Sequence, residues 1–198
     1  MGKQYANVVT SLGIILAVWF NYLLWSGYEN YAVLFFLFSL AALTDFVDGQ
    51  LARGLGIESI VGASMDRFRD KLLILPVFLF LMFKAFHPDN ILILSLARAS
   101  IILIMIIEVL IFSTWVYGIR RKLNIKAHKA GKIKTVMYIF VVAIWFLKGT
   151  PLYYIDKDIF LVFDILIAFS LSVSAYFALQ SFLGYVKRFH EANIVRNG

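Results

Sequence analysis

The most informative part of the sequence is Asp45-Phe46-Val47-Asp48-Gly49-Gln50-Leu51-Ala52-Arg53, followed after eight residues by Gly62, Asp66 and Asp70. Asp45 and Asp48 are three residues apart, and Asp66 and Asp70 are four apart, so each pair lies on one face of a helix. Two consecutive helices joined by a short connection run antiparallel. The two aspartate pairs are therefore predicted to converge.

Four carboxylates in a low-dielectric setting repel one another unless they are protonated or neutralised. Hard divalent cations with oxygen ligands neutralise them directly, and a chain without cysteine has no thiolate to offer a metal. A solvated turn with capping aspartates is the alternative, but it explains one or two of these residues and not two spaced pairs. The small residues Gly49, Ala52 and Gly62 allow close helix approach and leave room for a bulky substrate.

The composition outside this stretch predicts a membrane protein. Hydrophobic residues make up 62% of the 198 residues, which is more apolar surface than one soluble core of this length buries. A hydrocarbon core about 30 Å thick needs about 20 apolar residues per helix. We therefore expect an all-α membrane protein with a single domain over residues 1–198 and six transmembrane helices, near 7–25, 31–50, 71–86, 90–117, 133–149 and 158–186.

The distribution of lysine and arginine predicts the orientation of these spans. The connections 51–71 and 118–134 carry most of the basic residues, whereas only Lys84, Lys148 and Lys157 fall on the opposite side. Since positively charged loops stay in the cytoplasm, both termini are predicted cytoplasmic. A net charge of +7 suits anionic lipid headgroups or phosphorylated substrates. Nucleic acid is not an expected partner of so apolar a chain.

The string from Asp45 to Asp70 resembles the complete signature of the CDP-alcohol phosphatidyltransferase family, because every defined position matches. This resemblance implies an enzyme of phospholipid biosynthesis that moves a phosphatidyl group from CDP-diacylglycerol to a small alcohol and releases CMP. It also implies a homodimer. The compact chain without targeting extensions indicates the plasma membrane of a prokaryote, and the basic loops place the active site on the cytoplasmic side. The expected cofactor is one or two Mg²⁺ or Mn²⁺ ions per site, held by Asp45, Asp48, Asp66 and Asp70.

The same resemblance assigns roles to single residues. Asp70 resembles the general base that takes the proton from the acceptor hydroxyl, after which an in-line displacement proceeds without a covalent enzyme intermediate. The residues that resemble the CDP-lipid-binding positions are Asn7, Thr10, Asp45, Asp48, Gly49, Ala52, Arg53 and Gly62. For Asn7 and Thr10, capping of a helix N-terminus is an equal alternative.

The segment Gly131-Lys132-Ile133-Lys134-Thr135 bears on the acceptor. It resembles the Gly-Lys-x-Lys-Thr of bacterial phosphatidylglycerophosphate synthases, which act on glycerol 3-phosphate. Two lysines at a helix start suit a phosphate, although a positive-inside anchor needs only their charge. Arg98 lies within the fourth span and is a second candidate, or it pairs across helices. The predicted acceptor-phosphate residues are Arg98, Lys132, Lys134 and Thr135.

Departures from that subgroup leave other acceptors open. The subgroup usually has Asp-Pro-x-Ala-Asp-Lys where this chain reads Asp66-Arg67-Phe68-Arg69-Asp70-Lys71, and Tyr138 stands where a glutamine is often found. Inositol phosphate, serine or another acceptor is therefore an alternative. A cation transporter is the alternative class, because six helices with buried acidic residues also describe a cation pathway. Against it, the strong acidic signal lies at one side of the membrane.

Overall fold

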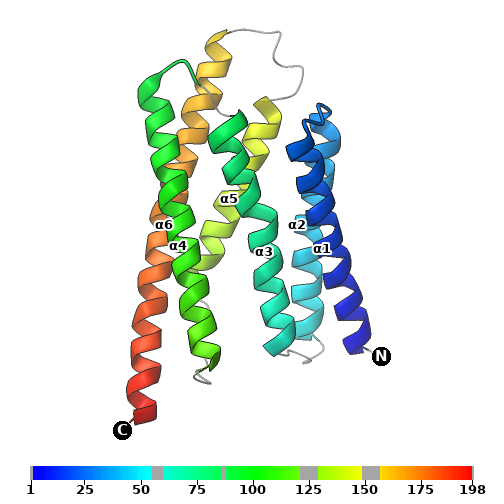
Figure 1. Ribbon diagram of the computed structural model, residues 1–198, viewed down its shortest axis with the longest axis vertical. Coiled ribbons are helices and arrows are strands. Elements are labelled where there is room, and N and C mark those ends of the chain that lie inside the picture. Colours follow the sequence, from blue (N-terminus) through cyan, green and yellow to red (C-terminus); the bar gives the residue numbers. More distant parts are fainter. Residues whose placement is uncertain (1, 55–59, 86–87, 121–128, 149–156, 198) are drawn as a thin grey trace. The chain divides into compact units, whose positions relative to one another are not determined.

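The computed structural model describes the backbone of residues 2–54, 60–85, 88–120, 129–148 and 157–197. Side chains are described for residues 11–44, 68–84, 88–118, 120, 131–148 and 159–191. Over these ranges the chain is helical and contains no strand, which confirms the all-α prediction. The helices, drawn in Figure 1, are α1 (Gly2–Ser26), α2 (Tyr31–Gly54), α3 (Ile60–Phe80), the π-helical segment η1 (Leu81–Ala85), α4 (Ile91–Arg120), α5 (Lys129–Lys148) and α6 (Lys157–Asn197).

The predicted spans fall on the described helices, but the span 71–86 is divided between α3 and η1, and its last residue, like that of the span 133–149, lies outside the described residues. The polar ends also differ from the prediction. α2 continues past the apolar run to Gly54, and α3 begins at Ile60, so both extend into the predicted connection 51–71. The predicted connection 118–134 is also entered by helix from both sides, because α4 continues to Arg120 and α5 begins at Lys129. Hydropathy sets the length of a span, whereas lysine, arginine and glutamine continue a helix beyond it.

Two helical stretches among the described residues are long and apolar enough to cross a membrane, Ile91–Gly118 and Ile159–Glu191. Two shorter apolar stretches, Ser11–Ser26 and Tyr31–Thr44, lie in α1 and α2. Their exposed faces carry large apolar side chains, among them Trp19, Phe36 and Phe169. An apolar outer surface of this kind is typical of helices that face lipid.

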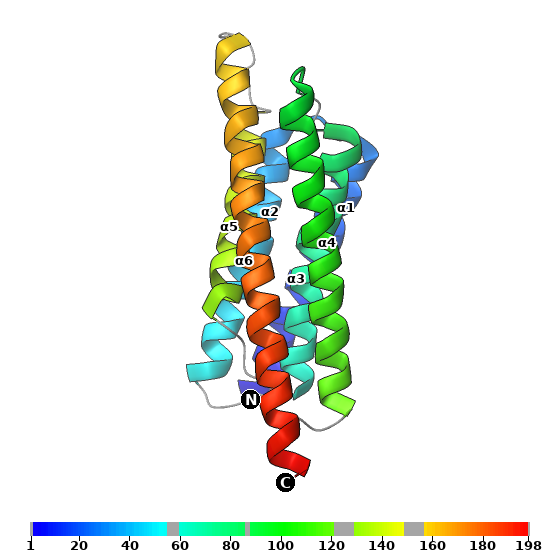
Figure 2. The same cartoon turned by 90° about the vertical axis from the view of Figure 1, so that its left-hand side faces the viewer.

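The described helices fall into two compact units. The first contains α1, α2, α3 and η1, and the second contains α4, α5 and α6. Within each unit successive α-helices run in opposite directions (Figure 1), as short connections require. In the second unit α6 packs along both α4 and α5 (Figure 2). The single domain over residues 1–198 stays a prediction.

In the first unit a polar contact joins α1 to α3. The Asn21 side-chain amide donates to the backbone oxygen of Ala17 at 2.8 Å and to that of Leu72 at 2.9 Å. Around it Phe20 and Phe38 pack with ring centroids 5.5 Å apart, and Phe78 is fully buried. These apolar contacts hold α1 against α2 and α3.

Gly13 marks a close approach of the three helices in the first unit. A Cβ atom at Gly13 would lie 2.6 Å from Nη1 of Arg69 in α3 and 3.0 Å from Oγ1 of Thr44 in α2. Arg69 is only 1% exposed, so its side chain has no route into solvent. The glycine is therefore what admits a buried arginine between α1, α2 and α3.

Gly13→Ala is expected to lower the free energy of unfolding by about 1–3 kcal/mol, because the added methyl group overpacks the Arg69 side chain. Thermal unfolding of the purified protein in detergent measures the effect. The same change should cost less in an Arg69→Ala background, which removes the closest obstructing atom. If Gly13→Ala lowers the free energy of unfolding equally in the natural chain and in Arg69→Ala, the glycine does not serve to make room for Arg69.

Candidate active site

The signature aspartates lie on consecutive helices of the first unit. Asp45 and Asp48 are in the C-terminal part of α2, and Asp66 and Asp70 are in the N-terminal part of α3. Because each helix is continuous through its pair, the spacings of three and four residues place each pair on one helix face, as predicted. α2 and α3 pack against each other. The Asp70 side chain is half-buried, and those of Asp45, Asp48 and Asp66 lie outside the described side chains.

This donor set fits a divalent metal. Carboxylate oxygens are the ligands that Mg²⁺ and Mn²⁺ prefer, and the two aspartate pairs lie on two contacting helices. No group of three acidic or histidine side chains occurs within the part of the chain whose side chains are described, but that part holds only one of the four aspartates. The arrangement of the ligands therefore stays a prediction.

The other residues predicted to bind the CDP-lipid also lie in the first unit. Gly49, Ala52 and Arg53 are in the final turns of α2, and Gly62 is near the start of α3. α1 begins at Gly2, so Asn7 and Thr10 lie within the helix and not at its N-cap. The capping alternative for these two residues is therefore wrong. Their side chains, like those of the α2 residues and Gly62, are outside the described set.

Arg69 is a buried arginine next to the signature aspartates, and its burial was not predicted from the sequence. It is fully buried and lies between Asp66 and Asp70 on α3. A guanidinium is always charged, and a buried charge requires an opposite charge or strong hydrogen bonds close by. α1, α2 and α3 contain no acidic residues other than the four aspartates.

The predicted acceptor residues lie in the second unit. Lys132 is exposed on the first turns of α5, and the Thr135 hydroxyl donates to the backbone oxygen of Gly131 at 3.1 Å. Lys134 is buried, with 7% of its surface exposed. Arg98 is exposed on α4. The two lysines of the motif therefore differ in exposure: Lys132 is exposed and Lys134 is buried.

Lys134 belongs to a buried polar cluster that joins α5 to α4. Its Nζ lies 2.5 Å from Oε1 of Glu108, and the hydroxyl of Tyr138 donates to the same oxygen at 2.9 Å. Glu108 is 1% exposed and Tyr138 is 4% exposed. Arg98 and Glu108 are ten residues apart on α4 and do not share a helix face, and Glu108 has its partners on α5 instead. Pairing between helices depends on their rotation, which spacing along one helix does not reveal.

A second lysine–carboxylate pair lies at the other end of α5. Lys148 Nζ bonds to Oδ1 of Asp164 in α6 and lies 5.7 Å from the centroid of the Phe160 ring. Asp164 is 6% exposed. Toward the first turns of α5, a Cβ atom at Gly131 would lie 3.2 Å from Oγ of Ser181, so α5 and α6 also approach closely there. α5 is therefore held by an ion pair near each end.

The sequence of this chain is similar to a known protein family and to several named relatives. The sequence model of the CDP-alcohol phosphatidyltransferase family matches residues 3–177. The CDP-diacylglycerol–glycerol-3-phosphate 3-phosphatidyltransferase of Rickettsia felis is 31% identical over 122 residues, which cover 61% of this chain and 62% of the relative. Its namesake in Mycoplasma genitalium is 27% identical over 154 residues, 76% of this chain and 61% of the relative. The match therefore spans about three fifths of the length of both relatives.

A further relative is covered more fully. The protein of the same name in Wigglesworthia glossinidia brevipalpis is 32% identical over 159 residues, and the match covers 79% of this chain and 81% of the relative. The family match includes all of α2 and α3, which carry the aspartates, and all of α4 and α5, which carry the Glu108 cluster.

Lys148→Met is expected to lower the free energy of unfolding by about 2 kcal/mol, because it leaves the Asp164 carboxylate buried without its partner. The cost is less than for a fully buried pair, since 19% of the Lys148 side chain is exposed. Thermal unfolding in detergent measures it. Lys148→Met combined with Asp164→Leu should recover most of the loss, and failure to recover would mean that the pair is not what stabilises this end of α5.

Proposed function

This chain belongs to the CDP-alcohol phosphatidyltransferase family, and from that membership we propose that it transfers a phosphatidyl group from CDP-diacylglycerol to glycerol 3-phosphate with release of CMP. The observation that carries the proposal is the complete aspartate signature on two consecutive, contacting helices, α2 and α3. The three relatives described above all bear the name of this reaction. The family match gives the cation-transporter alternative no support.

The four aspartates supply the metal-binding part of the proposed chemistry. Asp45, Asp48, Asp66 and Asp70 would hold one or two Mg²⁺ or Mn²⁺ ions. When bound, such an ion acts as a Lewis acid toward the pyrophosphate of the CDP-lipid and stabilises the charge of departing CMP. The family is generally dependent on divalent metal, and the donor set of this chain suits it.

Asp70 is the proposed general base. Its half-buried carboxylate accepts the proton of the acceptor hydroxyl, and the resulting oxygen attacks the lipid-linked phosphorus. A new bond forms between this oxygen and phosphorus, while the bond from phosphorus to the bridging pyrophosphate oxygen breaks. CMP leaves with that oxygen and its electron pair. No covalent bond to the protein is required.

The remaining signature residues are proposed to hold the nucleotide end of the CDP-lipid. Gly49, Ala52 and Gly62 lack bulky side chains and leave space along α2 and α3 for the substrate. Arg53 offers a planar fork of donors to phosphate oxygens. Asn7 and Thr10 lie within α1, where their amide and hydroxyl groups are proposed to contact the nucleotide.

Arg98, Lys132, Lys134 and Thr135 are the residues proposed for the acceptor phosphate. Support comes from the Gly-Lys-x-Lys-Thr motif at the start of α5 and from the printed names of the relatives. Two lysines and an arginine match an acceptor that carries a phosphate better than one that does not. Inositol phosphate therefore stays the closer alternative, and serine the more distant one.

We further propose that all six α-helices span the plasma membrane of a bacterium, with both termini and the aspartates on the cytoplasmic side. The two long apolar stretches in α4 and α6, the family and the bacterial sources of the relatives support a membrane location. The positive charge of the 118–134 segment supports the orientation. A homodimer is proposed from the family resemblance alone.

Asp70→Asn is expected to lower the rate of CMP release by about 10²–10⁴-fold, because the amide cannot accept the proton of the acceptor hydroxyl. The assay is CMP release by the purified chain in detergent with CDP-diacylglycerol, Mg²⁺ and glycerol 3-phosphate. Asp89→Asn, at an exposed aspartate outside the signature, is the matched control and should retain the activity. Full activity of Asp70→Asn would remove Asp70 from the mechanism.

Removal of divalent metal with EDTA is expected to abolish CMP release, and added Mg²⁺ or Mn²⁺ should restore it. The reason is that the four aspartates would face one another without a neutralising ion, and the pyrophosphate would lack its Lewis acid. Titration of each metal into the stripped protein measures the requirement. Undiminished activity in EDTA would contradict the metal-binding role of the signature.

A further inference from the structure

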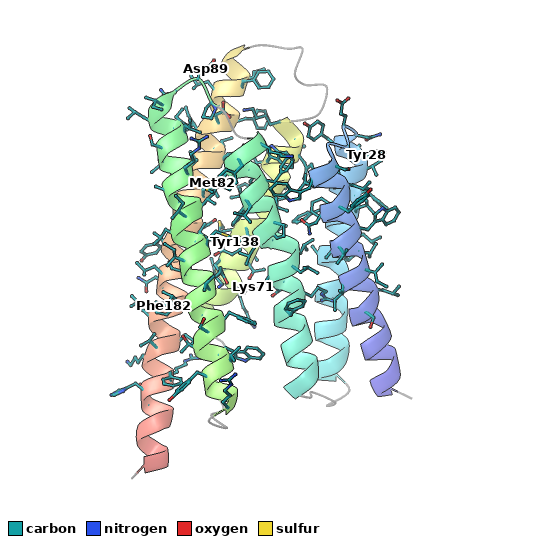
Figure 3. All side chains as sticks on the ribbon, viewed as in Figure 1. Tyr28, Lys71, Met82, Asp89, Tyr138 and Phe182 are labelled. Carbon is teal, nitrogen blue, oxygen red and sulfur yellow. The ribbon has the colours of Figure 1, made fainter. Side chains whose placement is uncertain are left out.

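A buried cluster of Glu108, Lys134 and Tyr138 connects α4 to α5. Apolar side chains alone could make such a helix contact, so this charged cluster suggests a further role. Glu108 lies within the long apolar stretch of α4 and is 1% exposed, which makes its carboxylate costly unless it is well paired. Both partners come from α5 and are four residues apart, so they share one face of that helix. Both donate to the same oxygen, Oε1 (Tyr138 is marked in Figure 3).

This arrangement fixes the position of a lysine ammonium. A free lysine side chain has about 2 kcal/mol of rotamer entropy to lose when it binds a ligand. Here the 2.5 Å contact with Glu108 orders the side chain in advance, and the Tyr138 hydroxyl orders the carboxylate in turn. An ordered cation binds a phosphate with a smaller entropy cost than an exposed, mobile one such as Lys132.

The cluster also places a carboxylate against the buried lysine. An isolated ammonium is expensive in an apolar interior and tends to lose its proton, whereas an adjacent carboxylate stabilises the charged form. An ammonium has three N–H donors, so a single lysine can donate to a carboxylate and to a phosphate oxygen at once. Lys134 retains 7% exposure on the first turns of α5, beside the exposed Lys132.

We propose that Glu108 is a positioning residue for the acceptor site: together with the Tyr138 hydroxyl it holds the Lys134 ammonium charged and oriented for the phosphate of the acceptor. This inference rests on the proposed function, in which Lys134 contacts that phosphate. It adds Glu108 and Tyr138, which do not touch substrate, to the residues that determine acceptor affinity.

Tyr138 gives the proposal a conservative test. Its part is to donate one hydrogen bond to Oε1 of Glu108. Phenylalanine removes the donor, whereas glutamine, which often stands at this position in the synthases that this chain resembles, supplies an N–H donor. Tyr138→Phe should therefore weaken acceptor binding, and Tyr138→Gln should weaken it less.

The experiment measures binding of glycerol 3-phosphate, and separately of inorganic phosphate, to the purified full chain in detergent by calorimetry, without CDP-lipid. Glu108→Gln and Lys134→Met are each expected to raise the Kd for glycerol 3-phosphate about tenfold, the loss of one charge-assisted hydrogen bond. The double variant should bind no more weakly than Lys134→Met alone, because Glu108 acts through Lys134. A higher Kd in the double variant than in Lys134→Met would show that Glu108 does not act through Lys134, which would overturn the proposal.

Asp164→Asn is the matched control, because it breaks the other lysine–carboxylate pair of α5. It should lower thermal stability as Glu108→Gln does, yet leave the Kd for glycerol 3-phosphate within about twofold. If Glu108→Gln and Asp164→Asn both leave that Kd unchanged, the Glu108 pair is structural and the proposal is overturned. If Glu108→Gln does not fold, Tyr138→Phe takes its place in the test, because this variant keeps the Lys134–Glu108 ion pair. An unchanged Kd for glycerol 3-phosphate in Tyr138→Phe would then overturn the proposal.

A CMP-release arm separates this inference from the proposed reaction. Glu108-dependent binding of glycerol 3-phosphate without CMP release would uphold the positioning role and reject the reaction. The opposite result is CMP release that depends on the acceptor, with an unchanged KM for glycerol 3-phosphate in Glu108→Gln and Tyr138→Phe. It would uphold the reaction and reject the positioning role of Glu108. If the folded natural chain binds neither glycerol 3-phosphate nor phosphate, Lys134 has no phosphate to be positioned for, and the inference is overturned.

Discussion

Charge buried inside an apolar helical protein has to be compensated locally, and this constraint governs the structure of the chain. In the first unit the constraint appears as Arg69, which is enclosed by α1, α2 and α3 on the helix that carries Asp66 and Asp70. In the second unit it appears as two ion pairs, Lys134 with Glu108 and Lys148 with Asp164. Apolar packing alone would hold these helices together, but it would not fix their rotation so closely.

The aspartates of the signature are the extreme case of the same constraint. Four carboxylates on the ends of two contacting helices carry more negative charge than one buried arginine balances. In the proposed function a divalent metal would complete the balance, and the same ion would act on the pyrophosphate. The motif therefore predicts both how the site is neutralised and what reaction it supports.

Sequence alone predicted the helices and the aspartate pairs because both are local properties. Apolar runs give the spans, and spacings of three and four residues give the shared faces, regardless of the partner helix. The helix ends at Gly54, Ile60 and Lys129 were less well predicted, since polar residues extend helices without a hydropathy signal. The contacts of Arg69 and the Glu108 cluster could not be predicted, because they depend on how helices rotate against one another. Tyr138, noted only as a departure from a motif, is explained by its bond to Glu108.

The most direct test of the account is to identify the lipid that the protein makes. Purified chain would be incubated with CDP-diacylglycerol, Mg²⁺ and equal concentrations of glycerol 3-phosphate, inositol phosphate and serine, and the lipid products analysed by mass spectrometry. The account predicts phosphatidylglycerophosphate as the main product, formed in equal amount with CMP. A product from one of the other two acceptors would keep the chemistry and reject the assigned acceptor. Folded protein that makes no lipid product from any of the three would contradict the central claim.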